Sequence, residues 1–309
     1  MNIITIRGEF SDNGPGTQAL TISTELRNRG HNVFMVSGGG YLVDKIKRLG
    51  IDYFHIPEIS YGSRNPINIL KAIYKIRKIL KQYDIDIIHG HNAFVVGICN
   101  ISSLGLKNKI KFFQSCRGTE LRKAFAFRNM IYRIVKYNKI FAVSQYTKET
   151  LMSFGVDSNK IEVTYNGTDL ERFNKDLIYK YNKEIRSEFG IPEDAIVIGI
   201  IGRMDGIKGH RDVIKVISEI SKSHDNVYGF LVGEGSEFES NKRLSEHLNI
   251  SNRVIFSGLR LDAEKLHASF DIFTLLSKKG FEMFPNVLVE AMTYSKPFVS
   301  VNTTGIPEM

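Results

Sequence analysis

A strand, a glycine-rich loop and a helix follow one another twice in this 309-residue sequence, and this repeat limits the folds open to the chain. Residues 3–7 predict a strand, 8–16 a loop rich in Gly, Ser, Asp and Asn, and 17–29 a helix before a second strand at 32–37. A continuous apolar strand at 195–201 restarts the pattern. This order predicts an α/β protein with two doubly wound parallel sheets.

The charged stretch between the two patterns predicts where the domains divide. Residues 174–190 lack a clear strand signal and are followed by Ile-Pro, so we place a linker or hinge there. The first domain is then 1–173 and the second 191–309. Further strands of the second domain are expected at 227–232, 254–256, 272–276 and 298–301.

The segment Phe-Glu-Met-Phe-Pro-Asn-Val-Leu-Val-Glu at 281–290 carries two carboxylates, Glu282 and Glu290, eight positions apart. Pro285 is predicted to take the first position of a helix, where a missing N–H costs nothing. This helix should end no later than Lys296, because a proline follows. The free N–H groups of a first helical turn bind anions, and carboxylates accept hydrogen bonds from hydroxyls. The combination suits a sugar nucleotide.

The segment 281–290 resembles the E-x7-E motif of the retaining family-4 (group 1) glycosyltransferases. Three more segments resemble motifs of that family in the family's order, namely Asn-Gly-Thr-Asp at 166–169, Gly-Arg and Lys-Gly within 202–209, and Val-Gly-Glu-Gly at 232–235. The resemblance implies the GT-B fold, in which two Rossmann-like domains face a cleft. It implies retaining transfer of a sugar from a nucleotide-sugar donor. We expect the transfer to be metal-independent and to move a hexose or N-acetylhexosamine from a UDP- or GDP-sugar to a glycan or lipid-linked acceptor, in surface polysaccharide biosynthesis. The donor is a substrate, and no cofactor is expected.

Two cations of the second domain are the main catalytic candidates. Arg203 and Lys208 are expected in the loop between a strand and a helix, where they would bind a diphosphate and stabilise its departing charge in place of a metal ion. By resemblance, Glu282 would contact hydroxyls of the transferred sugar and Glu290 those of the ribose. The resemblance also implies donor contacts at Gly202, Gly233, Glu234, Phe284, Pro285, Asn286 and Val287.

Candidates in the first domain lie where strands are expected to end, which is where open α/β sheets bind ligands. His91 would line the sugar site, whereas His89 points toward the sheet interior and is expected to be structural. Arg117 stands where many relatives carry histidine, and it can bind phosphate or carboxylate but cannot act as a base. The acceptor or phosphate side is predicted to include Gly14, Gly16, Arg117 and Asn166.

Positive charge is concentrated in the first domain. Residues 1–172 carry 25 Lys and Arg against 14 Asp and Glu, and residues 173–309 carry 17 against 19. A cationic amphipathic helix is predicted at 64–83 and a basic-aromatic run at 122–139. Such segments suit either a solvated surface or an anionic membrane surface. Nucleic acid is not expected as a partner, because no nucleic-acid motif accompanies them.

Several features bear on metal and location. Asp84-Ile85-Asp86 has the form of a metal-binding D-x-D motif, but it leads into a buried strand, and we predict no metal site. No signal-peptide pattern precedes the first strand, and Cys99 and Cys116 have neither metal nor disulfide spacing. We expect a cytoplasmic protein, with peripheral attachment to the inner membrane face as an option. The chain is expected to lack the last helices of the family.

Two other functions fit parts of the pattern. A nucleotide-sugar epimerase of the same fold would use other carboxylates and histidines and release nucleoside diphosphate without an acceptor product. A non-catalytic sugar-nucleotide-binding protein would bind the donor without turnover.

Overall fold

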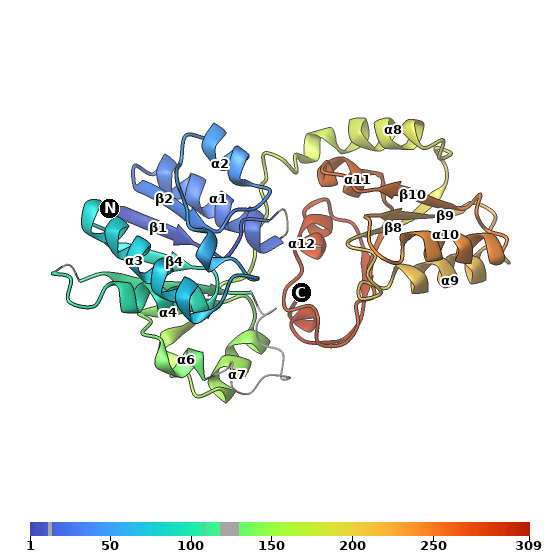
Figure 1. The fold of residues 1–309 in the computed structure, drawn as a ribbon. Coiled ribbons are helices and arrows are strands. Elements are labelled where there is room, and N and C mark those ends of the chain that lie inside the picture. Colours follow the sequence, from blue (N-terminus) through green and yellow to red (C-terminus); the bar gives the residue numbers. More distant parts are fainter. Residues whose placement is uncertain (12–13, 108, 118–129) are drawn as a thin grey trace. The chain divides into compact units, whose positions relative to one another are not determined.

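The computed structural model describes residues 1–309 except 12–13, 108 and 118–129 (Figure 1). Two compact units divide the chain, Met1–Tyr165 and Asn166–Met309. Each unit contains one sheet, and every strand pair described is parallel. The prediction of two doubly wound α/β units is thereby confirmed.

The sheet of the first unit has its order reversal beside the first strand. Its strands lie in the order β3-β2-β1-β4-β5-β6-β7. Ligands of open α/β sheets bind where the strand order reverses, which here is the carboxyl edge between β1 and β4. The strands are β1 (Asn2–Ile6), β2 (Asn32–Ser37), β3 (Asp52–His55), β4 (Ile87–Gly90), β5 (Lys111–Cys116), β6 (Lys139–Ala142) and β7 (Ile161–Val163).

Helices cover both faces of this sheet, which explains its nearly continuous apolar strands. Ile4 and Ile6 of β1 pack in one core with helix α3, and Met35 of β2 packs in another with helix α1. Ser144 caps α7 as predicted, since its Oγ accepts a hydrogen bond from the Thr147 N–H at 3.1 Å. The helices are α1 (Gly14–Asn28), α2 (Val43–Arg48), α3 (Pro66–Gln82), α4 (Ala93–Ser102), α6 (Ile131–Ile134) and α7 (Gln145–Ser153).

The second unit repeats the architecture with five strands in the order β10-β9-β8-β11-β12. The strands are β8 (Ile196–Ile201), β9 (Val227–Val232), β10 (Val254–Gly258), β11 (Ile272–Leu275) and β12 (Phe298–Ser300), close to the predicted bounds. The helices are α8 (Ile178–Glu188), α9 (His210–Ile220), α10 (Phe238–His247), α11 (Ala263–Ser269) and α12 (Asn286–Thr293). None of the helices in the described ranges of the chain is long and apolar enough to cross a bilayer.

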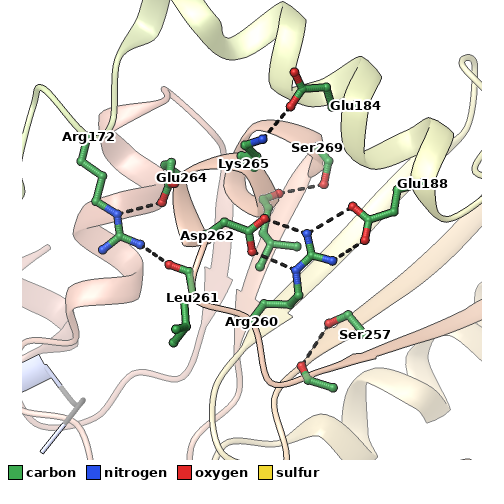
Figure 2. A network of polar contacts seen from close by, with 12 residues as sticks. Arg172, Glu184, Glu188, Ser257, Arg260, Leu261, Asp262, Glu264, Lys265 and Ser269 are labelled. Carbon is green, nitrogen blue, oxygen red and sulfur yellow. Dashed lines mark hydrogen bonds and ion pairs between the residues drawn. The ribbon is translucent and has the colours of Figure 1, made fainter. Parts of the chain in front are cut away.

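The stretch predicted as a linker contains α8, which packs on α11 of the second unit. Ile185 is buried in the core of that unit. Figure 2 shows the polar contacts that join α8 to α11 and to the loop before it: Lys265 of α11 pairs with Glu184 at 2.8 Å, and Arg260 of the loop binds both Glu188 and Asp262. These contacts make 178–188 a structural part of the second unit, while its role as a hinge stays a prediction.

Arg186 on α8 is a buried cation that organises the start of β8. Its guanidinium donates to the main-chain oxygens of Pro192, Glu193 and Ala195 at 3.0, 3.0 and 2.8 Å. It also pairs with Asp271 at 2.8 Å, whose carboxylate accepts from the Val197 N–H at 2.7 Å. The buried guanidinium therefore supplies the hydrogen bonds that these carbonyl groups would otherwise need from water.

Candidate active site

Two loops meet at the carboxyl ends of β8 and β9 in the second unit. The backbone of Gly233 has φ +130°, and a Cβ there would lie 1.9 Å from the carbonyl oxygen of Gly202. The Met204 N–H donates to the Glu234 carbonyl at 2.9 Å and continues this contact. Only glycine permits so close an approach. The backbones of the predicted motifs at 202–209 and 232–235 therefore lie in direct contact.

Lys208 lies in the first of these loops, two residues before α9. Its aliphatic stem covers Gly202, where a Cβ would approach Lys208 Cγ to 3.1 Å. Gly209 follows with φ +91° and is the N-cap of α9, packed so tightly that a Cβ would lie 2.6 Å from Leu276. The glycine allows α9 to begin directly at the loop, and the N–H groups of its first turn lie beside the Lys208 backbone.

Glu282, in the loop between β11 and α12, contacts Lys208. Lys208 Nζ donates to Glu282 Oε1 at 2.6 Å, and Ser277 Oγ donates to the same oxygen at 2.7 Å. Glu282 is 5% exposed, and the Thr304 hydroxyl donates to its main-chain carbonyl. Lys208 and Ser277 fix the orientation of the carboxylate, while Thr304 holds the main chain at Glu282.

Arg203 differs from Lys208 in being extended into solvent. Its side chain is 74% exposed and pairs with Asp205 at 2.8 Å. Asp205 in turn accepts from the Ile207 N–H at 3.2 Å, which shapes the loop. The two predicted phosphate-binding cations thus lie on one loop, but only Lys208 is held by a buried partner.

The helix of the E-x7-E segment begins one residue later than predicted. Pro285 is the N-cap of α12, because its ψ of 127° is extended, and Asn286 is the first helical residue. Val287 packs at the edge of the core and Leu288 within it. The predicted end is confirmed, since the helix stops at Thr293.

Glu290 is oriented by a histidine that sequence reasoning missed. His267 Nε2 donates to Glu290 Oε2 at 3.3 Å, and His267 is fully buried against the rings of Phe173, Phe270 and Phe273. No motif marks His267, and only its position on the inner side of α11 distinguishes it. Glu290 therefore lies in a fixed position, one turn inside α12.

Asn166, which is predicted on the acceptor or phosphate side within domain 1–173, begins the second unit and contacts the E-x7-E segment. Its Nδ2 donates to the main-chain oxygen of Phe284 at 2.7 Å. Glu234 is exposed at the carboxyl end of β9, beside Gly233. The structure thus gathers the predicted second-domain residues at one edge of one sheet.

The remaining candidates lie in the first unit. Gly14 and Gly16 occupy the first turn of α1 and not the preceding loop, so the helix begins three residues earlier than the predicted Thr17. Segment 118–129, which includes part of the basic-aromatic run at 122–139, lies outside the described residues.

His91 follows β4 and is buried at 6% exposure. Its ring lies 4.6 Å from that of His89, whose Nε2 is 2.9 Å from Ser115 Oγ. Burial, together with His89, Arg117 and Arg7, holds the pKa of His91 well below its usual range. Burial and Arg117 lower the pKa of His89 to about 4. Both rings are neutral at neutral pH, and Arg7 is a further neighbour that sequence reasoning missed.

Family models match nearly the whole chain. The model for Glycosyltransferase Family 4 matches residues 12–172, and the model for Glycosyl transferases group 1 matches residues 182–309. The chain is a group 1 glycosyltransferase. This membership agrees with the two parallel-sheet units of the GT-B fold and with the gathered motif residues of this glycosyltransferase.

Two relatives align with different shares of this glycosyltransferase. It is 28% identical over 306 residues to N-acetyl-alpha-D-glucosaminyl L-malate synthase of Bacillus anthracis, covering 96% of this chain and 77% of the relative. It is 25% identical over 265 residues to alpha-monoglucosyldiacylglycerol synthase of Streptococcus pneumoniae, covering 81% of this chain and 59% of the relative.

Solved structures support the fold. A glycosyltransferase from Rickettsia africae superposes with a TM-score of 0.83 at 22% identity, covering 99% of this chain and 80% of that one. Anabaena Alr3699/HepE in complex with UDP-glucose superposes with a TM-score of 0.79 at 20% identity, covering 100% and 82%. At these identities the comparison establishes the GT-B fold.

Proposed function

We propose that this glycosyltransferase transfers a hexose or N-acetylhexosamine, with retention of configuration, from a UDP- or GDP-sugar to a glycan or lipid-linked acceptor in surface polysaccharide biosynthesis. The observation that carries the proposal is the Lys208–Glu282 pair beside the N-terminus of α9. It places a cation, a carboxylate and free helical N–H groups together, as a sugar diphosphate requires. The UDP-glucose bound by the Anabaena neighbour supports this class of donor.

In this proposal the diphosphate binds at the start of α9. An ammonium group has three donors, so Lys208 can contact a phosphate oxygen without leaving Glu282. The exposed Arg203 adds a second cation, and the N–H groups of the first turn of α9 add their partial positive charge. Together they stabilise the negative charge that develops on the leaving nucleoside diphosphate.

The two carboxylates bind hydroxyls in this proposal. Glu282 accepts from hydroxyls of the transferred sugar, and Glu290 accepts from the ribose diol while His267 holds its other contact. The bond from the anomeric carbon to the phosphate oxygen breaks as the acceptor oxygen bonds to the same face of the sugar. The acceptor proton passes to the leaving phosphate oxygen, so no carboxylate nucleophile is required.

We also propose that the acceptor is met at an anionic membrane surface. The predicted inward stripe of α3 packs in the core, with Ile76 and Leu80 buried. The helix has a second apolar row, Ile67, Leu70 and Tyr74, that is 66%, 67% and 72% exposed. Helical spacing puts these three side chains on one face, bordered by exposed Lys71, Lys78 and Lys81. An exposed apolar row beside lysines suits shallow insertion into an anionic leaflet.

The test begins with a panel of nucleotide sugars scored by thermal shift, since a bound ligand raises the unfolding temperature. The stabilising donor is then incubated with candidate acceptors, and the product linkage is determined by NMR. An α-linked product from an α-linked donor supports the proposal. Nucleoside diphosphate released with an epimerised sugar, or tight donor binding with no product from any acceptor, would contradict it.

A further inference from the structure

Three polar side chains of the first unit converge at its order reversal. Arg7 and His91 directly follow the paired strands β1 and β4, where Ile6 is opposite Gly90 and the His91 N–H donates to the Ile6 carbonyl at 3.0 Å. Neighbouring strands lie about 4.8 Å apart, so Arg7 and His91 are side by side. Arg117 follows β5, the next strand of the sheet.

The side chain of Arg7 is buried, and two of its nitrogens make no hydrogen bond. It is 7% exposed, and its Nε and Nη1 have no hydrogen-bond partner. Both ring nitrogens of His91 are also buried and unpartnered. The paired registers place Arg7, His91 and Arg117 at the ends of three adjacent strands. Burial and the charge of Arg7 lower the pKa of Arg117 to about 10, in keeping with this arrangement. A buried cation costs several kcal/mol unless it is paired.

The start of α1 lies on the same side of the sheet. Ser23 Oγ in α1 donates to Thr5 Oγ1 in β1 at 2.9 Å, and Thr5 and Arg7 face the same side because strand side chains alternate. Helix α1 runs antiparallel to β1. Its first turn, with Gly14 and Gly16, therefore lies near the carboxyl end of β1, where Arg7 is. Helix N–H groups there add partial positive charge near the same place.

We propose that Arg7, His91 and Arg117 bind an anionic group of the acceptor, either a carboxylate or a phosphate monoester. The inference rests on the proposed function, because only a transferase has an acceptor. Planar guanidinium groups match both anions bidentately, and neutral His91 can donate one N–H. The donor diphosphate has its own cations at Lys208 and Arg203 in the second unit. A buried site excludes the flat surface of a bilayer, so the anion belongs to a molecule that enters it.

The first experiment titrates inorganic phosphate, and separately malonate, at constant ionic strength while the unfolding temperature is followed. Wild type and the control Arg48→Gln, an exposed arginine of the same unit, should be stabilised by the anion. Arg7→Gln should lose most of that shift, yet unfold at the same or a higher temperature without anion, because a repulsion is removed. Arg7→Lys should keep part of the shift. Equal shifts in Arg7→Gln and wild type, or an Arg7→Gln variant much less stable without anion, would overturn the proposal.

The second experiment separates the acceptor from the donor and carboxylate from phosphate. UDP should stabilise Arg7→Gln as it does wild type, whereas Lys208→Gln should lose the UDP shift. Hexuronic acids, hexose phosphates and neutral hexosides then serve as acceptors. Arg7→Gln should lower kcat/KM about 10- to 100-fold for the preferred anionic class, and by less for neutral hexosides. The control Arg48→Gln should leave kcat/KM for the anionic class unchanged.

Three results would overturn the acceptor-anion site or the proposed function. Loss of both the phosphate and UDP shifts in Arg7→Gln would assign the anion to the donor and overturn the inference. Transfer only to neutral acceptors would also overturn it. An Arg7-dependent phosphate shift with no nucleotide-sugar shift in wild type would instead reject the proposed function and with it the acceptor assignment.

Discussion

Lys208 Nζ and Glu282 Oε1 lie 2.6 Å apart, which joins two motif residues that are 74 positions apart in the chain. The Lys208 side chain is 28% exposed and that of Glu282 only 7%, so the pair presents a cation over a buried carboxylate. A ligand can reach the lysine, while the glutamate depends on the lysine for its counter-charge. The two residues therefore have coupled effects on stability and on catalysis.

Lys208→Ala and Arg203→Ala should each lower kcat by about 10²- to 10³-fold, because each removes a donor to the leaving diphosphate. Their effects on stability should differ. Lys208→Ala leaves a buried carboxylate unpaired and should cost about 2 kcal/mol in the free energy of unfolding, whereas Arg203→Ala should cost less than about 0.5 kcal/mol.

The double variant Lys208→Ala/Glu282→Gln should recover stability without recovering turnover, since it removes the unpaired charge but not the need for the cation. Denaturant unfolding and steady-state kinetics check both statements. Wild-type turnover by folded Arg203→Ala and Lys208→Ala would reject the diphosphate assignment.

Activity should persist in excess EDTA. In the proposed mechanism, the cations of the 202–209 loop and the first turn of α9 supply the electrostatic stabilisation that a metal ion provides in other transferases. The measurement is the initial rate after dialysis against chelator, compared with the rate after adding back Mg²⁺ or Mn²⁺. Loss of activity that either metal restores would contradict this prediction.

This glycosyltransferase should bind anionic vesicles more tightly than neutral ones. Neutralising Lys71, Lys78 and Lys81 to Gln should weaken vesicle binding by roughly 100-fold, at about 1 kcal/mol for each lysine. We leave Lys75 in place because it pairs with Glu58 at 2.5 Å.

The matched control neutralises three other exposed lysines of the first unit, Lys45, Lys47 and Lys160. Vesicle co-sedimentation gives the affinities, and thermal shift should show unchanged donor binding in both variants. Equal weakening by the two triple variants would mean that α3 is not the contact surface. Replacing Leu70 and Tyr74 by Ser should reduce binding at high salt, where the apolar row matters most.

Arg186→Met should destabilise the second unit by about 3 kcal/mol. The substitution keeps the apolar stem but leaves Asp271 and the carbonyl groups at the start of β8 without their donor. Lys222→Met, in the same unit, is the control, because its pair with Glu219 is surface-exposed and contributes little. The measurement is the free energy of unfolding of the second unit by chemical denaturation. If Arg186→Met lowers it no more than the control does, the structural role of Arg186 is contradicted.

Stability should fall on acidification from pH 6.5 to 4, in part through His210. Burial lowers the pKa of His210 to about 4 in the folded protein. Below pH 6.5 the unfolded chain binds a proton that the folded chain does not, so the free energy of unfolding decreases until the folded pKa is reached.

His210→Gln should therefore lose less stability over this pH range, by up to about 3 kcal/mol. His224→Gln, at an exposed position, serves as the control and should behave as wild type. The measurement is the free energy of unfolding at pH 7, 5.5 and 4. Parallel pH curves for wild type and His210→Gln would contradict the assignment.

Much of the local structure of this glycosyltransferase follows from its sequence. Continuous apolar runs predict β1 and β8, and the proline after Lys296 ends α12, because periodicity and backbone restrictions act over a few residues. The glycines at 202 and 233 mark close backbone approach for the same reason. Motif order along the chain was sufficient to predict the family, which the family models confirm.

Contacts between distant residues were decided only by the tertiary structure. Glu290 contacts His267 because α11 and α12 pack together. Arg7 lies beside His91, and Arg117 follows the next strand, because the order of parallel strands determines which carboxyl ends become neighbours. Strand order depends on packing across the whole sheet and leaves no local pattern in the sequence. For the same reason the charge of segment 174–190 predicts a linker or hinge but does not predict that its helix α8, with buried Ile185 and Arg186, packs on the second unit.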